Sequence, residues 1–192
     1  MGCNLKSALK DKTTCKLSLA GTGDRAFFFD KADLYGEDGV LPEPGDGGKY
    51  AAADFAPLQG KLVAVDIKSN SGQVTSSKTA ETEANSQVGT FVCTDNIDGF
   101  NELAHALAFI DFGCLIPRVG GGYYVIMSPY KKTTLENNYD SGTTYDSDHG
   151  FTVTVTAAPS EYSITTWTPA TNVDLLTWCE DETGGNQGGA GS

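Results

Sequence analysis

The feature that most limits the fold of this chain is a strict alternation of side-chain types over residues 151–157. Side chains of an extended strand point in turn to opposite faces, so this segment has one apolar face and one threonine face. The apolar positions are Phe151, Val153, Val155 and Ala157, and the threonines are Thr152, Thr154 and Thr156. β-Branched residues suit a pleated, half-buried surface. The pattern predicts a β-strand with one face on a core, and hence a body built from sheets.

Other segments have strand character, and one has helical spacing. Alternation or short apolar runs predict strands at residues 24–35, 62–68, 89–94, 114–116, 123–127 and 164–168. Apolar residues three and four apart predict a helix over residues 98–112, whose buried face comprises Phe100, Leu103, Leu107 and Ile110. We expect Asp98 to cap this helix and Gly113 to end it.

The length of 192 residues and the hydrophobic content of 39% fit one domain with a modest core. Residues 1–20 are interpreted as a basic N-terminal arm, 21–178 as a single β-rich domain, and 179–192 as a flexible acidic and Gly-rich tail. Gly and Pro in residues 36–60 indicate a surface loop insertion that makes contacts. Residues 69–88 contain almost no large apolar side chains, which fits either a solvated hairpin or a disordered loop.

The net charge of −12 excludes free nucleic acid and anionic membranes as binding partners, because like charges repel. The charge is also uneven along the chain. The first 31 residues hold six Lys and Arg, whereas none follows Lys132. A basic front and an acidic back suit head-to-tail contact between copies, and a solvated acidic surface is the alternative.

No set of residues predicts catalysis, so we expect no catalytic, cofactor-binding or metal-binding residues and no cofactor. Nucleophilic catalysis needs a base beside a nucleophile, but the chain has only two histidines. His105 lies off the apolar stripe of the predicted helix, and His149 lies in a turn-like Asp-Ser-Asp-His-Gly run. Asp140, Asp146 and Asp148 offer oxygen ligands for calcium, but the spacing and closing Glu of an EF-hand are absent.

The remaining candidate motifs also have simple structural readings. The run of three glycines at residues 120–122 lacks the Lys and Ser/Thr of a phosphate loop. Trp167 and Trp178 fit core or interface packing, and exposed tryptophan that stacks on sugar rings is the alternative. The five cysteines have no close spacing, which predicts reduced thiols, with Cys93 and Cys114 packed as small hydrophobic residues.

The sequence shows neither a membrane span nor a signal-peptide core. Its opening, Met1-Gly2-Cys3, fits an acylation signal only in part, because Lys6 occupies the place of the usual Ser or Thr. We therefore expect no membrane partner.

Five short segments resemble one family. They are the opening Met1-Gly2-Cys3-Asn4-Leu5 with Cys15, then Arg25-Ala26-Phe27-Phe28-Phe29, Gln87-Val88-Gly89-Thr90-Phe91, Gly122-Tyr123-Tyr124-Val125-Ile126, and residues 139–157. In the last segment a Ser-Gly pair, aspartates, a Gly-aromatic pair and alternating threonines resemble a closing hairpin. Together they resemble the small tail-tube-type virion structural proteins of crAss-like and related phages of Bacteroidetes hosts. Residues 36–60 and those after Trp167 depart from the family pattern.

The resemblance implies a mainly β fold of two packed antiparallel sheets, as a sandwich or open barrel, with one flanking helix. It implies that copies form rings, with six copies as one option, and that rings stack into a tail tube through which DNA passes without specific binding. Other phage tail or head–tail proteins would be further partners. The protein would be made in the host bacterial cytoplasm and would reside in the virion.

Two other classes of function remain open. One is another virion role, such as capsid decoration or a head–tail ring, and the other is a carbohydrate-binding or adhesin module. If the chain assembles into rings, we expect the basic N-terminal arm and residues 69–88 to make the contacts between copies. The contact candidates are Lys6, Lys10, Lys12, Lys16, Val74, Thr75, Lys78 and Glu83.

Overall fold

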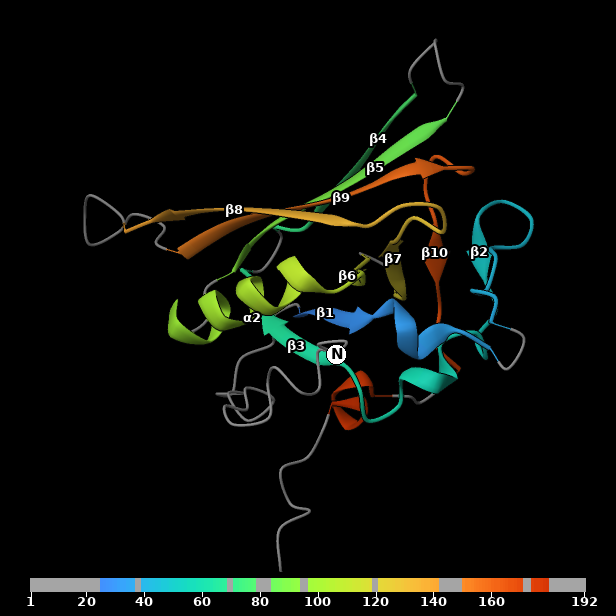
Figure 1. Ribbon diagram of the computed structural model, residues 1–192, viewed down its shortest axis with the longest axis horizontal. Helices are drawn as coiled ribbons and strands as arrows, with labels where there is room; N and C mark the ends of the chain where they lie inside the picture. The colour runs from blue at the N-terminus through green and yellow to red at the C-terminus, as the bar shows by residue number, and fades with distance from the viewer. Residues whose placement is uncertain are drawn as a thin grey trace, which may run out of the picture.

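The computed structural model has two packed β-sheets and one α-helix, in agreement with the mainly β class (Figure 1). It describes residues 25–36, 39–68, 71–78, 84–93, 97–118, 121–141, 150–170 and 174–179. The calls on the N-terminal arm, on Glu83 and on Asp146, Asp148 and His149 lie outside these residues, as does nearly all of the C-terminal tail.

The larger sheet has six strands in the order β2-β10-β7-β6-β1-β3. Their bounds are β1 (Arg25–Asp30), β2 (Lys49–Tyr50), β3 (Val63–Asp66), β6 (Phe112–Pro117), β7 (Tyr123–Ile126) and β10 (Thr166–Trp167). All neighbours are antiparallel except β10 and β2, which are parallel. Short 3-10 helices follow β1 and precede β3, and a third ends the described chain: η1 (Lys31–Leu34), η2 (Ala56–Leu58) and η3 (Leu175–Trp178).

β1 is buried on both faces because it carries phenylalanine at three successive positions. Phe28 points into the core between the sheets, whereas Phe27 and Phe29 point to the opposite face. Each ring is at most 4% exposed. Burial of an aromatic side chain contributes about 1.5–3 kcal/mol, so this strand requires a covering layer on each side of its sheet.

The smaller sheet has four antiparallel strands in the order β4-β5-β9-β8. The strands are β4 (Gln73–Lys78), β5 (Asn85–Cys93), β8 (Thr134–Asp140) and β9 (Gly150–Ser160). The predicted alternation of β9 is confirmed, since Phe151, Val153, Val155 and Ala157 are all buried. Of the two readings of residues 69–88, the hairpin is found for the described residues, because β4 pairs with β5.

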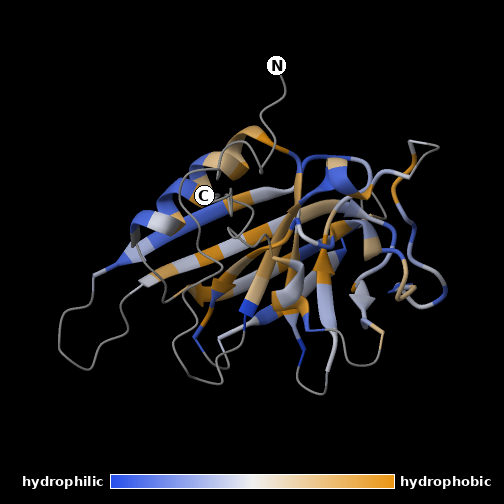
Figure 2. Cartoon of the chain, turned by 90° about the horizontal axis from the view of Figure 1, so that it is seen from below, coloured by the Kyte–Doolittle hydropathy of each residue, from blue (hydrophilic) through white to orange (hydrophobic). Residues whose placement is uncertain are grey.

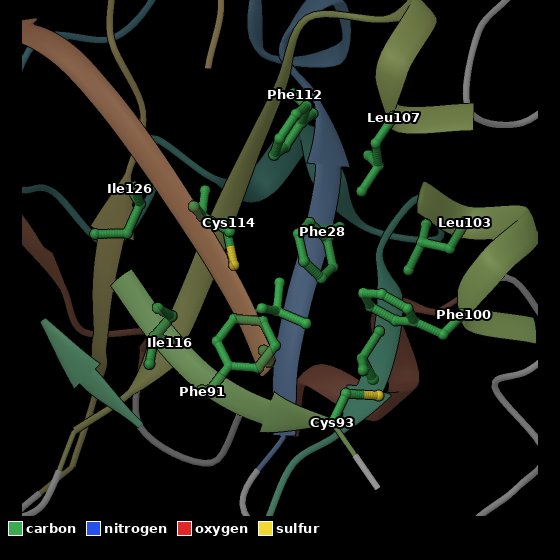
Figure 3. Packing of buried hydrophobic residues seen from close by; sticks show 14 of the residues in the cluster. Phe28, Phe91, Cys93, Phe100, Leu103, Leu107, Phe112, Cys114, Ile116 and Ile126 are labelled. Atoms are coloured by element: carbon green, nitrogen blue, oxygen red, sulfur yellow. The ribbon is translucent and has the colours of Figure 1, made fainter. Parts of the chain in front are cut away.

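The first core fills the space between the two sheets (Figure 3). Phe28 of the larger sheet lies near Phe91 of β5, with ring centroids 6.2 Å apart. The helix α2 (Ile97–Phe109) closes one side of this core, and its side chains Phe100, Leu103 and Leu107 point toward Phe28 in Figure 3. Apolar residues accordingly concentrate on the central strands in Figure 2.

A second core covers the other face of the larger sheet. Chain segments with little regular structure supply it, including Leu41, Tyr50, Phe55 and Leu58 from the stretch expected to be a surface loop insertion. Phe55 packs against Phe29, with ring centroids 5.8 Å apart, and against Trp167, at 4.9 Å. Much of residues 36–60 is therefore a structural layer, because the double burial of β1 needs it.

The bounds of α2 differ from those expected. The helix ends at Phe109, not at residue 112, and Asp98 lies inside its first turn, so Asp98 is not the cap. Gly113 does not end the helix either, because it lies in β6 and pairs with Phe29. Pairing with β1 and burial of Phe112 between the sheets favour the extended conformation here. The expected helix face is confirmed, since Phe100, Leu103, Leu107 and Ile110 are all buried.

The pairing of Gly113 with Phe29 leads to a stability prediction. A Cβ atom at Gly113 would overlap the ring of Phe29, which is itself fixed between the sheet and Phe55. We expect Gly113→Ala to lower the free energy of unfolding by about 1–3 kcal/mol, because overpacking forces side chains off their rotamers. In the control Gly45→Ala, the new methyl group meets only the Lys49 carbonyl oxygen at 3.6 Å. Urea denaturation of both variants tests this, and equal midpoints would contradict it.

Candidate assembly surface

The outer face of the four-stranded sheet is uncovered in the described part of the chain. Figure 1 shows α2 and the larger sheet together on the opposite side of this sheet. The strand register places alternate residues on the outer face, and all of them are exposed or half-buried. They are Gln73, Thr75, Ser77, Ser86, Val88, Thr90, Val92, Thr134, Glu136, Asn138, Asp140, Thr152, Thr154 and Thr156.

This outer face is polar, rich in hydroxyl groups and free of bases. Its charged members are Glu136 and Asp140, and none of the residues just named is Lys, Arg or His. A surface of this kind gives water hydrogen-bonding partners but gives nucleic-acid phosphates no cation to pair with. The arrangement therefore favours contact with water over tight anion binding.

The sheet has two edges, β4 and β8, whose outer sides pair with no described strand. In β8 every residue except Leu135 is exposed, and in β4 only Val74 and Ser76 are half-buried. Unpaired edge strands present backbone N–H and C=O groups that can pair with another chain. The four-stranded sheet can thus be extended at both sides.

A buried amide cluster fixes this sheet to the larger one. Gln87 of β5 is fully buried, and its Nε2 donates to Ser160 Oγ at 3.0 Å and to the Tyr162 carbonyl at 2.9 Å. The Thr165 hydroxyl lies 3.2 Å from Gln87 Oε1 and donates to the Val125 carbonyl of β7 at 2.5 Å. These bonds hold the crossover from β9 to β10 against both sheets. We call Gln87, Ser160 and Thr165 the crossover cluster.

Lys31 is a buried charge with a structural explanation. Its Nζ contacts Asp111 Oδ2 at 2.6 Å, the Ser128 carbonyl at 2.7 Å and the Lys131 carbonyl at 3.1 Å. An ammonium has three donors, so all of them are used. The lysine ties η1 to the end of α2 and to the turn before β8, and it offers no free amine for chemistry.

The described residues also contain no set of three or more His, Cys, Asp and Glu that could hold a metal ion. Cys93, Cys114 and Cys179 are buried thiols that form no disulfide with one another, which confirms the packing role expected for the first two. Burial raises the pKa of the Cys114 thiol far above its ordinary value. Because the thiolate is the nucleophile, this thiol is unreactive at neutral pH.

The contact candidates fall in different places. Thr75 lies on the outer face, Lys78 is exposed at the end of β4, and Val74 points inward and packs against the first core. Lys6, Lys10, Lys12, Lys16 and Glu83 lie outside the described residues. Val74 is therefore a packing residue in this subunit, whereas Thr75 and Lys78 remain available at the surface.

Other residues singled out in the sequence have clear positions. His105 is exposed on α2, off the buried stripe as expected, and its ring contacts that of Phe109 in a tilted arrangement, with centroids 5.0 Å apart. Trp167 is only 1% exposed and packs against the half-buried Trp178. A buried Trp167 cannot stack on a sugar ring, so the described structure gives the tryptophan pair a core role.

Sequence reasoning missed the β8 part of the surface. Residues 134–140 read Thr-Leu-Glu-Asn-Asn-Tyr-Asp, and asparagine is depleted in strands, so propensity gave no strand here. The only available signal was the resemblance of residues 139–157 to a hairpin. The structure has a β8–β9 pair in that position, with Asp140 opposite Gly150.

None of the helices in the described part of the chain has the length and apolar content needed to cross a membrane. Comparisons of the chain with protein-family models, with curated proteins and with solved structures gave no match.

The crossover cluster should contribute to stability more than any outer-face residue. Gln87→Ala leaves the Ser160 and Thr165 hydroxyls and the Tyr162 carbonyl without this partner in a buried site. We expect a loss of about 2–4 kcal/mol in the free energy of unfolding. The control Thr75→Ala, at an exposed position of the same sheet, should change it by less than about 0.5 kcal/mol. Similar losses for both variants, measured by chemical denaturation, would refute a special role for the cluster.

The buried thiols give a second measurable expectation. In native protein at pH 8, Cys93, Cys114 and Cys179 should not react with a thiol reagent, since they are at most 4% exposed. After unfolding in guanidinium, all five cysteines of the chain should react. Mass spectrometry of labelled peptides identifies the sites. Rapid native labelling of Cys114 would show that the core opens far more readily than its packing indicates.

Proposed function

We propose that this chain is a virion structural protein that assembles into stacked rings and forms a phage tail tube, a conduit for DNA. The observation that carries the proposal is the base-free, hydroxyl-rich outer face of the four-stranded sheet, whose two edge strands pair with no further described strand. In the proposed ring this face lines the lumen, and β8 of one copy pairs with β4 of the next. The resemblance of the sequence to tail-tube proteins points the same way.

The strand directions are compatible with such a ring. The four strands alternate in direction, so β4 and β8 run opposite to one another. Rotation about a ring axis preserves strand direction. A β8–β4 junction between neighbours is therefore antiparallel, and the alternation continues around the ring without a break. An odd number of strands would have forced a parallel pair at every junction.

The stagger of the strands also supports closure. The centre of β4 lies level with Thr156 and Ala157 of β9, whereas the centre of β8 lies level with Val153. If β8 pairs over its full length with β4 of the next copy, that copy is shifted along the strand direction by about three to four residues. The shift accumulates over the width of four strands. With rises of about 3.3 Å and strand spacings of about 4.8 Å, the strands would tilt by about 30° from the ring axis. Closed barrels have tilts of about 35–45°.

The charge of the outer face suits passage of DNA. Each Lys or Arg that neutralises a phosphate releases counterions and adds to affinity. The face offers none, and its two acids repel the phosphate backbone at short range. A lumen of this composition would let DNA slide. Other phage tail or head–tail proteins would then cap the two ends of the tube.

Proline substitution at the β8 edge tests the proposal directly. Of two successive strand residues, one N–H points toward β9 and the other points away to the open edge. We therefore make Asn137→Pro and Asn138→Pro, both at exposed positions. One should destabilise the subunit, because it removes a ladder hydrogen bond. The other should keep the free energy of unfolding within about 1 kcal/mol of the wild-type value. It should abolish rings and tubes in negative-stain micrographs of concentrated protein.

The matched controls are Asn137→Ala and Asn138→Ala, which change the side chain but keep the N–H. Both should assemble like wild type. If the wild-type protein forms neither rings nor tubes at high concentration, the proposed function fails. If both proline variants fold and assemble normally, β8 is not the junction.

A further inference from the structure

A small recess lies beside the crossover, between the end of β7 and the segment before β2. Its walls include the buried Tyr50, Met127 and Thr165 and the more exposed Tyr130 and Tyr162. Figure 1 shows β7, β10 and β2 at one side of the molecule and α2 at the other. The recess has a cavity volume of about 20 Å³, which is room for about one water-sized group.

The lining of the recess is acidic. Glu43 and Glu161 line it, and no Lys, Arg or His is among its lining residues. Lys49 and Lys131 neighbour two of the lining tyrosines in sequence, but both are exposed and lie outside the wall. Burial raises the pKa of Tyr50, and the charges of Asp54 and Glu43 raise it further. The phenol therefore stays neutral beside these carboxylates, and the two lining glutamates favour a cation over an anion.

Aromatic rings add to the preference for a cation. Tyr130 stands at the rim and is 66% exposed, an unusual position for a large aromatic side chain with no covering element described. Tyr50 and Tyr162 contribute further rings to the wall. The faces of aromatic rings attract ammonium groups, and an ammonium is about the size of a water molecule. The recess thus fits the tip of a lysine side chain better than a sugar, a nucleotide or an anion.

We propose that this recess receives a lysine side chain from the N-terminal segment, residues 1–24, of a second copy of the chain. This segment carries Lys6, Lys10, Lys12 and Lys16. Twenty-four residues in extended form can span about 80 Å, which is ample reach to a neighbour. The inference rests on the proposed function, because it names the contact between one ring and the next.

The start of β1 and the recess lie at opposite ends of the larger sheet. The N-terminal segment joins β1 at Arg25, which by register lies level with Pro117 and Tyr123. The recess lies beyond the other end of β7, at Met127. β1 also runs from Arg25 toward the recess end, so Arg25 lies at the opposite end of the sheet. A copy stacked head-to-tail would present its recess to that end.

Cross-linking of the full-length chain tests the contact. Lys131→Cys places a thiol beside Tyr130 at an exposed position, leaves the recess wall intact and removes no acid. The N-terminal segment supplies Cys3 and Cys15, the latter next to Lys16. The other three cysteines are buried and should not react. A short bismaleimide should give a ladder of dimers and larger species, with peptides joining residue 131 to Cys15 or Cys3.

Two matched variants sharpen the result. Asn101→Cys, on the exposed face of α2, should give at least fivefold less of the cross-linked dimer. Adding Glu43→Gln and Glu161→Gln to Lys131→Cys should lower the dimer yield at least threefold while leaving the thermal unfolding midpoint unchanged. Cross-links found only within one chain, equal yields from residues 101 and 131, or no effect of the two Glu→Gln changes would each overturn the proposal.

The test separates this inference from the proposed function. Tubes in micrographs without the 131-to-arm cross-link would overturn the recess contact and leave the tail-tube role standing. Intermolecular cross-links in a protein that never forms rings or tubes would support the recess contact and overturn the tube.

Discussion

Burial of β1 on both faces is the constraint on which the rest of the structure depends. A strand with phenylalanine on both sides cannot lie at a surface, so its sheet needs two covers. The four-stranded sheet and α2 supply one cover. The chain supplies the other from segments with little regular structure, anchored by Phe55, which packs against Trp167 of β10. Since the smaller sheet is used as a cover, it has only one apolar face. The described residues cover neither its second face nor its two edges, and these form the proposed assembly surface.

Sequence patterns correctly predicted the elements that have one buried face and one exposed face, because such elements show a regular periodicity. The alternation in residues 151–157 and the helical spacing around Leu103 each reflect one buried face and one open face. The sequence patterns gave wrong predictions where the conformation of a residue depends on a partner that is distant in the sequence. Gly113 resembles a helix stop, but it lies in a strand because the Phe29 ring packs over it. Residues 36–60 contain the glycine and proline of a loop, yet a few apolar side chains among them complete the second core.

The candidate surface was less accessible to sequence reasoning than the fold. A sequence shows that Thr152, Thr154 and Thr156 share a face, but it does not show which strands extend that face on either side. That depends on register, and β8 joins the face although its own composition is unfavourable for a strand. Thr75 and Lys78 were identified because the hairpin lacks large apolar residues. The recess beside Tyr130 could not be anticipated, since its walls come from three separate parts of the chain.

The order of the strands along the chain has a consequence for the timing of folding. Neither sheet is made from one continuous stretch: the smaller sheet takes β4 and β5 and then β8 and β9, while strands of the larger sheet precede, separate and follow these pairs. Such interleaving makes most contacts non-local, and loop closure must precede them, which slows folding. A chain still on the ribosome cannot complete either layer until β9 and β10 have emerged. Until then the unpaired strands of both sheets remain exposed, and this is the stage at which the chain is most prone to aggregate.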